Sequence, residues 1–114
     1  MGNVVREKSV EFSVCICKFY VYLKWKRLYE IADQLFRSWT SIWANIAEAQ
    51  YAITPREFIA KLQISLKEWY ETLYRFELLE QWFWENCLKM KEDCTSLVKL
   101  LTAIIKKTKE NNNY

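Results

Sequence analysis

Hydrophobic residues recur at helical spacing along four stretches of this chain, and the clearest stretch runs from Ile31 to Gln50. On a helix that turns about 100° per residue, its apolar residues gather on one side and its polar residues on the other. The apolar side consists of Ile31, Ala32, Leu35, Trp39, Ile42, Trp43, Ile46 and Ala49, with Phe36 and Ala47 at its edge. This arc spans about 160°, wider than the roughly 100° of one packed face. We therefore expect its own chain or a neighbour to bury most of this helix.

Three further helices are predicted, from about Glu7 to Lys26, from Pro55 to about Trp84 and from about Glu92 to Lys109. At the start of the third helix, Thr54 can act as the N-cap and Pro55 suits the first helical position. The side chain of Glu57 can complete a capping box with Thr54. The connections are expected near residues 27–30, 52–54 and 85–91, and residues 1–6 and 110–114 are expected to be disordered. The inner faces are predicted at Phe58, Ile59, Leu62, Leu66, Trp69, Tyr70, Leu73 and Phe76, and at Cys94, Leu97, Val98, Leu100, Leu101, Ile104 and Ile105.

The first helix carries two apolar stripes about half a turn apart. One stripe consists of Val10, Val14, Val21, Trp25 and Leu28, and the other of Phe12, Ile16, Phe19 and Leu23. A helix that is apolar on two sides needs two partners. One partner is the bundle core, and we expect the second to be another subunit; the alternative is that the long third helix covers Phe12 and Phe19. Ile64, Leu78 and Trp82 form a comparable second patch on the third helix.

The scarcity of turn-forming residues supports a helical fold. The 114 residues include one Gly and one Pro, where average usage supplies about eight and six. This scarcity disfavours a β-sandwich or barrel and suits long helices with short connections. The chain length fits one domain with a real core. We therefore predict an all-α, antiparallel up-down-up-down four-helix bundle that forms a single domain over residues 1–114.

Several kinds of catalytic site are excluded because the chain has no histidine. Ser-His-Asp and Cys-His arrangements and the Glu-x-x-His pairs of di-metal bundles all need an imidazole. No glycine-rich loop is present to hold a phosphate, so we predict no enzyme activity, no cofactor and no metal. An all-carboxylate site of Glu48, Glu68 and Glu71 is the remaining catalytic alternative. We instead expect Glu48 and Asn45 to form a buried polar pair toward Lys61 or Lys67, and the four cysteines to be small reduced hydrophobes.

The charge balance is mildly basic, with 17 basic and 14 acidic residues and a net charge of +3. No apolar run approaches the roughly eighteen residues of a membrane span, and MGNVVREKS shows no secretory pattern, so we expect a cytoplasmic protein without a membrane partner. Two basic clusters could contact phosphates, and Trp25 and Tyr29 beside the first of them could stack on bases. The alternative is a solvated turn for the first cluster and a favourable helix end for the second. These clusters are Lys24, Lys26 and Arg27, and Lys106, Lys107 and Lys109.

The segment from Ser38 to Ala49 reads S-x-T-S-I-x-A-N-I-x-E-A and is followed by TPREFIAKLQISLKEWYETLYRFELL. This pattern resembles a bacterial four-helix-bundle family that includes proteins encoded in insertions within large-subunit ribosomal RNA genes, and the accessory protein of diversity-generating retroelements is similar. The resemblance covers about Val4 to Lys109. It implies an up-down-up-down bundle, a five-fold ring in several members, no enzyme activity, and a partner that is nucleic acid or a nucleic-acid enzyme.

The chain departs from the family pattern at Trp39 and Trp43, where small residues are usual. We expect both tryptophans, with Phe12, Phe19 and Trp82, to form the interface of a closed homo-oligomer, a pentamer by resemblance. A competing interpretation places Trp39 and Trp43 in the protomer core. Two functional alternatives stay open: a small-molecule-binding bundle with a Trp-rich apolar pocket, and a redesigned-interface variant of the family.

Overall fold

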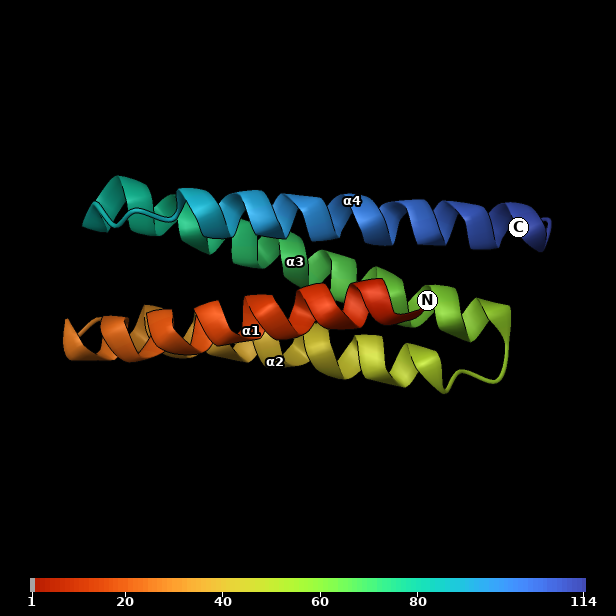
Figure 1. The fold of residues 1–114 in the computed structure, drawn as a ribbon, viewed down its shortest axis with the longest axis horizontal. Helices are drawn as coiled ribbons and strands as arrows, with labels where there is room; N and C mark the ends of the chain where they lie inside the picture. Colours follow the sequence, from red (N-terminus) through yellow and green to blue (C-terminus); the bar gives the residue numbers. More distant parts are fainter. Residues whose placement is uncertain (1) are drawn as a thin grey trace.

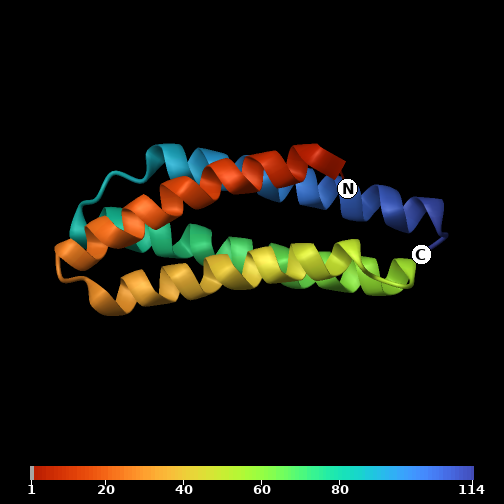
Figure 2. The same cartoon turned by 60° about the horizontal axis from the view of Figure 1, so that its bottom comes forward.

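Four helices run up and down in turn along one bundle (Figure 1). The computed structural model describes the backbone of residues 2–114 and the side chains of residues 7–114. The helices are α1 (Gly2–Trp25), α2 (Tyr29–Gln50), α3 (Pro55–Phe83) and α4 (Leu88–Asn111). The bundle measures 48 × 21 × 21 Å, and the α1–α2 and α3–α4 connections lie together at one end (Figure 2). The predicted all-α four-helix fold is confirmed.

The helices lie around a square in which α1 and α3 are diagonal partners. Backbone contacts join α1 to α2, α2 to α3, α3 to α4 and α4 to α1. The α2–α3 pair is the closest, and the α1–α4 pair is the loosest. The outward faces of α1 and α3 therefore point away from each other. Within the described part of the chain, no helix is both long and apolar enough to cross a membrane.

Local hydrogen bonds define the helix ends. Thr54 Oγ1 accepts from the backbone N–H of Glu57 at 3.1 Å, as predicted, but the Glu57 carboxylate accepts from the N–H of Ile53 at 3.0 Å instead of closing onto Thr54. The α1 end is a Schellman turn, in which Leu28 N donates to Leu23 O at 2.9 Å and Arg27 takes a left-handed φ of 64°. A chain with a single glycine must place other residues in such turns.

Three boundaries differ from the sequence-based expectation. The α4 helix begins at Leu88 and not near Glu92, because Asn86 Oδ1 accepts from the Leu88 N–H at 3.2 Å and starts the helix earlier. Residues 110–114 were expected to be disordered, yet α4 continues to Asn111, and the Tyr114 ring lies 4.3 Å from the Arg56 guanidinium. Residues 1–6 were also expected to be disordered, whereas α1 begins at Gly2; Met1 and the side chains of residues 2–6 lie outside the described residues.

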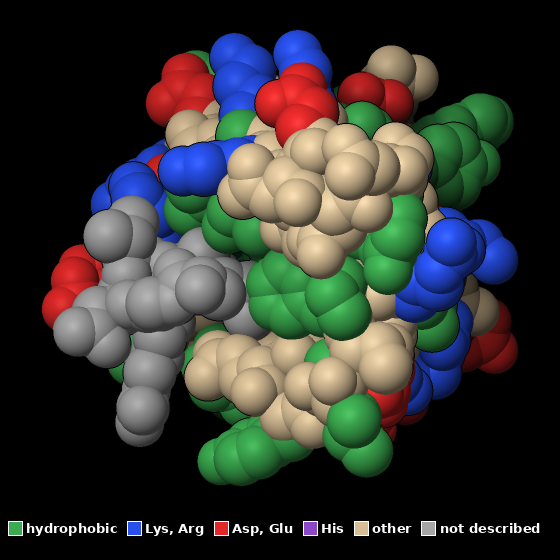
Figure 3. Space-filling view, turned by 90° about the vertical axis from the view of Figure 1, so that its right-hand side faces the viewer, with side chains coloured by type: hydrophobic (Ala, Val, Ile, Leu, Met, Phe, Trp, Pro, Cys, Tyr) green, Lys and Arg blue, Asp and Glu red, His purple; other side chains and the backbone are tan. Residues whose placement is uncertain are grey.

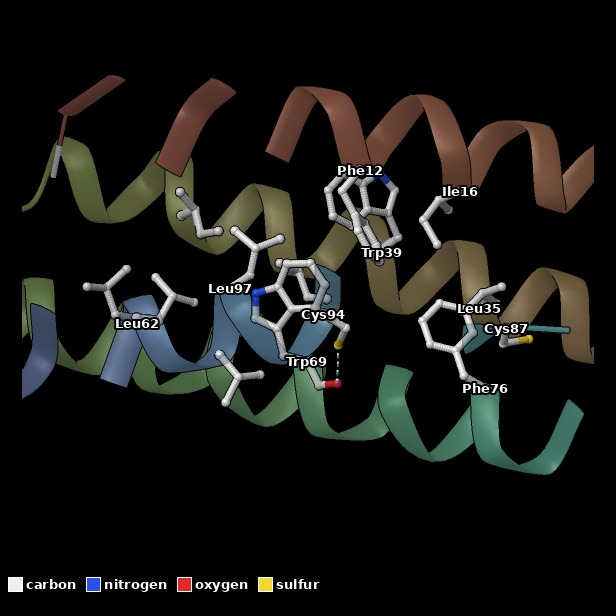
Figure 4. Close-up of a cluster of buried hydrophobic side chains, with 14 of the residues drawn as sticks. Phe12, Ile16, Leu35, Trp39, Leu62, Trp69, Phe76, Cys87, Cys94 and Leu97 are labelled. Atoms are coloured by element: carbon white, nitrogen blue, oxygen red, sulfur yellow. Dashed lines mark hydrogen bonds between the residues drawn. The ribbon is translucent and has the colours of Figure 1, made fainter. Parts of the chain in front are cut away.

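An aromatic cluster forms the centre of the core (Figure 4). The Phe12 ring lies 5.1 Å from Trp69, 5.4 Å from Trp39 and 6.4 Å from Phe76. Aromatic pairs at such separations attract beyond the area that they bury. The cluster therefore ties α1, α2 and α3 together across the bundle, and Cys94 Sγ adds α4 through a 3.6 Å contact with Trp69 O.

Most of the predicted inner faces are confirmed. Every residue predicted for the inner face of α2 is buried or half-buried apart from Trp43, which lies at the exposed boundary. In α3, Tyr70 was expected inside but is exposed, whereas Leu79 is buried without having been predicted. The Tyr70 hydroxyl explains the difference, because burial without a hydrogen-bond partner is costly.

Polar contacts join α2 to α3 along the outside of their seam. Lys61 Nζ lies 2.7 Å from Glu48 Oε2, so Lys61 is the one of the two predicted lysines that Glu48 contacts. The predicted burial of this pair is wrong, because both side chains are partly exposed. The Glu48 carboxylate raises the pKa of Lys61. Asn45 does not join this pair; its amide donates to the backbone carbonyl of Ser41 at 2.8 Å.

Candidate functional site

The outer face of α1 carries an apolar stripe that stays exposed within the described part of the chain. We define the α1 stripe as Val10, Val14, Cys17, Val21 and Trp25. The three valines and the tryptophan are 50%, 50%, 68% and 79% exposed, and Cys17 is also exposed. Successive members are four, three, four and four residues apart. This spacing is typical of a seam that packs against another helix.

The outer face of α3 carries a second exposed apolar surface. We define the α3 face as Ile64, Tyr70, Tyr74 and Trp82, all of which are exposed. A shallow hollow of about 540 Å³ lies on this helix, lined by Gln63, Leu66, Lys67, Tyr70, Glu71 and Tyr74. Because α1 and α3 are diagonal partners, the α1 stripe and the α3 face lie on opposite sides of the bundle.

Exposed tryptophans mark the end of the bundle where the α1–α2 and α3–α4 connections meet. Trp25 ends α1, Trp82 lies in the last turn of α3, and Trp84 follows it with a left-handed φ of 55°. All three indoles are exposed. Lys26 of one connection is 2.5 Å from the buried carboxylate of Glu85 in the other, so the two connections are held together. This end combines unusual backbone geometry with large exposed aromatic surface.

The predicted interface residues divide into two groups, and the prediction is wrong for Phe12 and Trp39. These two side chains are only 2% and 5% exposed in the protomer because they pack against Trp69. Phe19 is half-buried against Phe76, so the alternative that α3 covers Phe12 and Phe19 describes this stripe correctly. Trp43, at 36% exposed, and Trp82 remain available at the surface.

The predicted basic residues do not form one surface. Lys24, Lys26 and Arg27 lie at the end with the exposed tryptophans, whereas Lys106, Lys107 and Lys109 lie near the C-terminus at the opposite end. Figure 3 views that opposite end, where blue side chains lie on several sides and are separated by polar and hydrophobic atoms.

In the cluster of Lys24, Lys26 and Arg27, both lysines pair with carboxylates. Lys24 Nζ is 2.8 Å from Asp33 Oδ1, and this hydrogen bond raises the pKa of Lys24 and lowers that of Asp33. The hydrogen bond with Glu85 likewise raises the pKa of Lys26. Arg27 forms no salt bridge with any described residue and remains available to an anionic partner.

The carboxylates Glu48, Glu68 and Glu71 have different partners. Glu48 is engaged by Lys61, and Glu71 Oε2 lies 4.0 Å from Arg75. Desolvation, followed by the charge of Glu71, raises the pKa of Glu68. Among residues 7–114, no three His, Cys, Asp or Glu side chains are grouped so that they could hold a metal ion.

The cysteines differ sharply in their surroundings. Burial raises the pKa of the Cys87 and Cys94 thiols to about 12, so both stay protonated near neutral pH. Cys15 is half-buried and Cys17 is exposed. Cys17, a member of the α1 stripe, is therefore the thiol most accessible to reagents.

Both stripes of α1 were visible in the sequence, but the predicted interface included Phe12 and Phe19, which belong to the stripe that packs in the core. Residue type distinguishes the two stripes, because the one that faces the core holds two phenylalanines and the exposed one holds three valines beside Cys17 and Trp25. Tyr70, Tyr74 and Trp84 were not among the predicted surface contacts. Their high exposure becomes visible only once the helices are placed.

Two comparisons place this arrangement among known proteins. The model of the 23S rRNA-intervening sequence protein family matches residues 2–109. A crystal structure of a protein with unknown function from the S23 ribosomal protein family of Bacteroides thetaiotaomicron VPI-5482 shares 40% sequence identity with this chain. The likeness covers 90% of this chain and 98% of that one, with a TM-score of 0.84. No curated protein matches the chain.

Proposed function

The chain belongs to the 23S rRNA-intervening sequence protein family, and we propose that it is a non-enzymatic helical scaffold that assembles with copies of itself. The α1 stripe is the observation that carries this proposal. It places four exposed apolar side chains and Cys17 along one helix face. A contiguous apolar patch of this kind on a small domain marks an interaction surface.

The spacing of the α1 stripe favours another helix as the partner. Side chains that repeat at intervals of three and four residues follow one side of a helix and fit between the side chains of a neighbouring helix. Another copy of this chain supplies such a helix surface, because the α3 face is exposed and apolar. Self-assembly would cover both surfaces with a single kind of contact.

Light scattering after size-exclusion chromatography tests the proposal. We expect a mass that is a multiple of the 13.9 kDa protomer at micromolar concentration, and we expect it to persist in high salt because the contact is apolar. A mass of one protomer throughout the micromolar range would refute self-assembly.

A second candidate function is contact with nucleic acid at the end that carries the exposed tryptophans. Arg27 lies two residues after Trp25 in the sequence. Arg27 and Phe83 line one hollow of about 600 Å³ together with Tyr29, Tyr74 and Arg75. Aromatic rings can stack on bases while guanidinium groups bind phosphates. We propose single-stranded RNA as the ligand of this end. No tryptophan lines this hollow, which gives no support to a Trp-rich small-molecule pocket.

The RNA proposal predicts a salt-dependent affinity that depends on Arg27. Retention of a labelled single-stranded RNA should fall steeply as salt rises from 50 to 200 mM. The affinity should drop roughly tenfold for every two phosphates that the protein contacts. Arg27→Gln should weaken binding, whereas Lys99→Gln, an exposed lysine on α4, serves as a charge-matched control and should have a smaller effect. Equal losses in both variants, or no retention at 50 mM salt, would eliminate a specific site at Arg27.

A further inference from the structure

We infer that a groove between α3 and α4 binds an acidic amphipathic helix of a different protein. The groove has a volume of about 520 Å³, and most of its lining residues lie on α4. Self-assembly through the α1 stripe and the α3 face has only Tyr70 in common with it. We call it the α3–α4 groove, and its main walls are Tyr70, Leu73, Val98, Lys99, Ala103 and Lys106.

Apolar side chains from both helices form the floor of the α3–α4 groove. Leu73 is half-buried and Val98 is buried, whereas Ala103 is exposed and too small to fill the space beside them. Thr95 and Thr102 also line the groove, and each hydroxyl donates to a backbone carbonyl of its own helix at 2.8 Å. An apolar groove of this kind suits the apolar side of another helix, a recurring mode of peptide recognition.

The charged side chains that line the groove are all positive. Lys99 and Lys106 are exposed, and no acidic residue lines the groove. Neither lysine forms a salt bridge with any described residue. Exposed Lys67 adds a third ammonium group nearby, because it lines the hollow on α3 to which Tyr70 also belongs. Complementary charge at an interface selects the partner, so these ammonium groups favour an acidic one.

The spacing of the two groove lysines favours a helical partner. Lys99 and Lys106 are seven residues apart, which places them on one side of α4 and roughly 10 Å apart along its axis. Two acidic residues seven apart on a partner helix have the same separation. A helix that lies along the groove can therefore pair with both lysines, while the apolar residues between its acids contact the floor. The backbone of a nucleic acid would leave this apolar floor without a partner.

Two synthetic peptides of identical composition test the geometry. Each has about 18 residues, enough for partial helicity when free, and consists of alanine, glutamine, leucine and two glutamates. In the matched peptide the glutamates are seven residues apart and flank the leucines. In the shifted peptide one glutamate is moved to the opposite side of the helix. Fluorescence anisotropy should show that the protein binds the matched peptide about threefold more tightly, the effect of one exposed ion pair.

Charge reversal in the groove is the second measurement. Lys99→Glu/Lys106→Glu should weaken binding of the matched peptide about tenfold, and it should prefer a version of that peptide in which lysines replace both glutamates. The control Lys89→Glu/Lys107→Glu makes the same charge change at exposed positions of α4 that do not line the groove, and it should have little effect. Ala103→Phe fills the groove without changing charge and should also weaken binding, while circular dichroism checks that each variant keeps its helicity.

Three results would overturn the acidic-helix partner. Equal affinity for the two peptides, or equal weakening by the two double variants, would show that net charge alone attracts the peptide. No binding of the matched peptide would leave the groove without the inferred partner. Retention of single-stranded RNA that Lys99→Glu/Lys106→Glu abolishes, without peptide binding, would assign these lysines to nucleic acid. Self-assembly is measured separately by solution mass, so none of these results bears on it.

Discussion

Replacing Trp39 with alanine is expected to lower the free energy of unfolding by about 3–5 kcal/mol, the usual cost of deleting a buried aromatic side chain. The reason is the position of its ring, which lies 5.4 Å from Phe12 and 5.7 Å from Trp69 at the centre of the core. The loss would leave a cavity that three helices share. Urea unfolding followed by circular dichroism measures the change.

Trp43→Ala is the matched control for that experiment, because Trp43 lies one turn further along α2 and is 36% exposed. Its ring stacks on Trp39 at 6.5 Å but lies at the edge of the core. We expect a loss of about 1 kcal/mol, within the usual range for a single substitution. Equal losses for the two variants would contradict the division of these tryptophans between core and surface.

The double substitution Val14→Glu/Val21→Glu is expected to dissociate the assembly into protomers while the helices remain folded. Both positions are exposed in the protomer, so the change should alter its free energy of unfolding by only about 0.5 kcal/mol. In the assembly, both carboxylates would lie against the apolar α3 face without a partner, which strongly disfavours association. Mass by light scattering, with helicity by circular dichroism, reports the two effects separately.

Ile53→Glu provides the control, since it also exchanges an exposed aliphatic side chain for a carboxylate. Ile53 lies in the α2–α3 connection, outside both the α1 stripe and the α3 face. The solution mass of the Ile53→Glu variant should equal that of the parent chain. Dissociation by Ile53→Glu would show that added negative charge, rather than position on α1, controls assembly.

The fold could be predicted from local sequence patterns, namely helical periodicity and capping residues, and the structure shows both. The period of the α2 residues placed Leu35, Ile42 and Ile46 on the buried side, and all three are buried. Thr54 and Pro55 predicted the start of α3 because capping chemistry depends on neighbouring residues. Positions on adjacent helices also gave Lys61 as one of two predicted partners of Glu48. These features depend on spacing along one helix or between sequential helices.

The exposed apolar surfaces were harder to predict because they depend on how each helix is rotated about its own axis in the bundle. Either stripe of α1 could have faced inward, and the core selected the one with Phe12, whose ring fills the space between Trp39 and Trp69. Periodicity cannot make that choice, since both stripes have the same spacing. The pairing of Lys24 with Asp33 and of Lys26 with Glu85 was invisible for the same reason.

The central claim is that the α1 stripe is an assembly surface, and the most direct test is the solution mass of the parent chain beside Val14→Glu/Val21→Glu at the same micromolar concentration. Our account predicts a multiple of 13.9 kDa for the parent and a single folded protomer for the variant. A monomeric parent, or a variant that keeps the parent's mass, would contradict it.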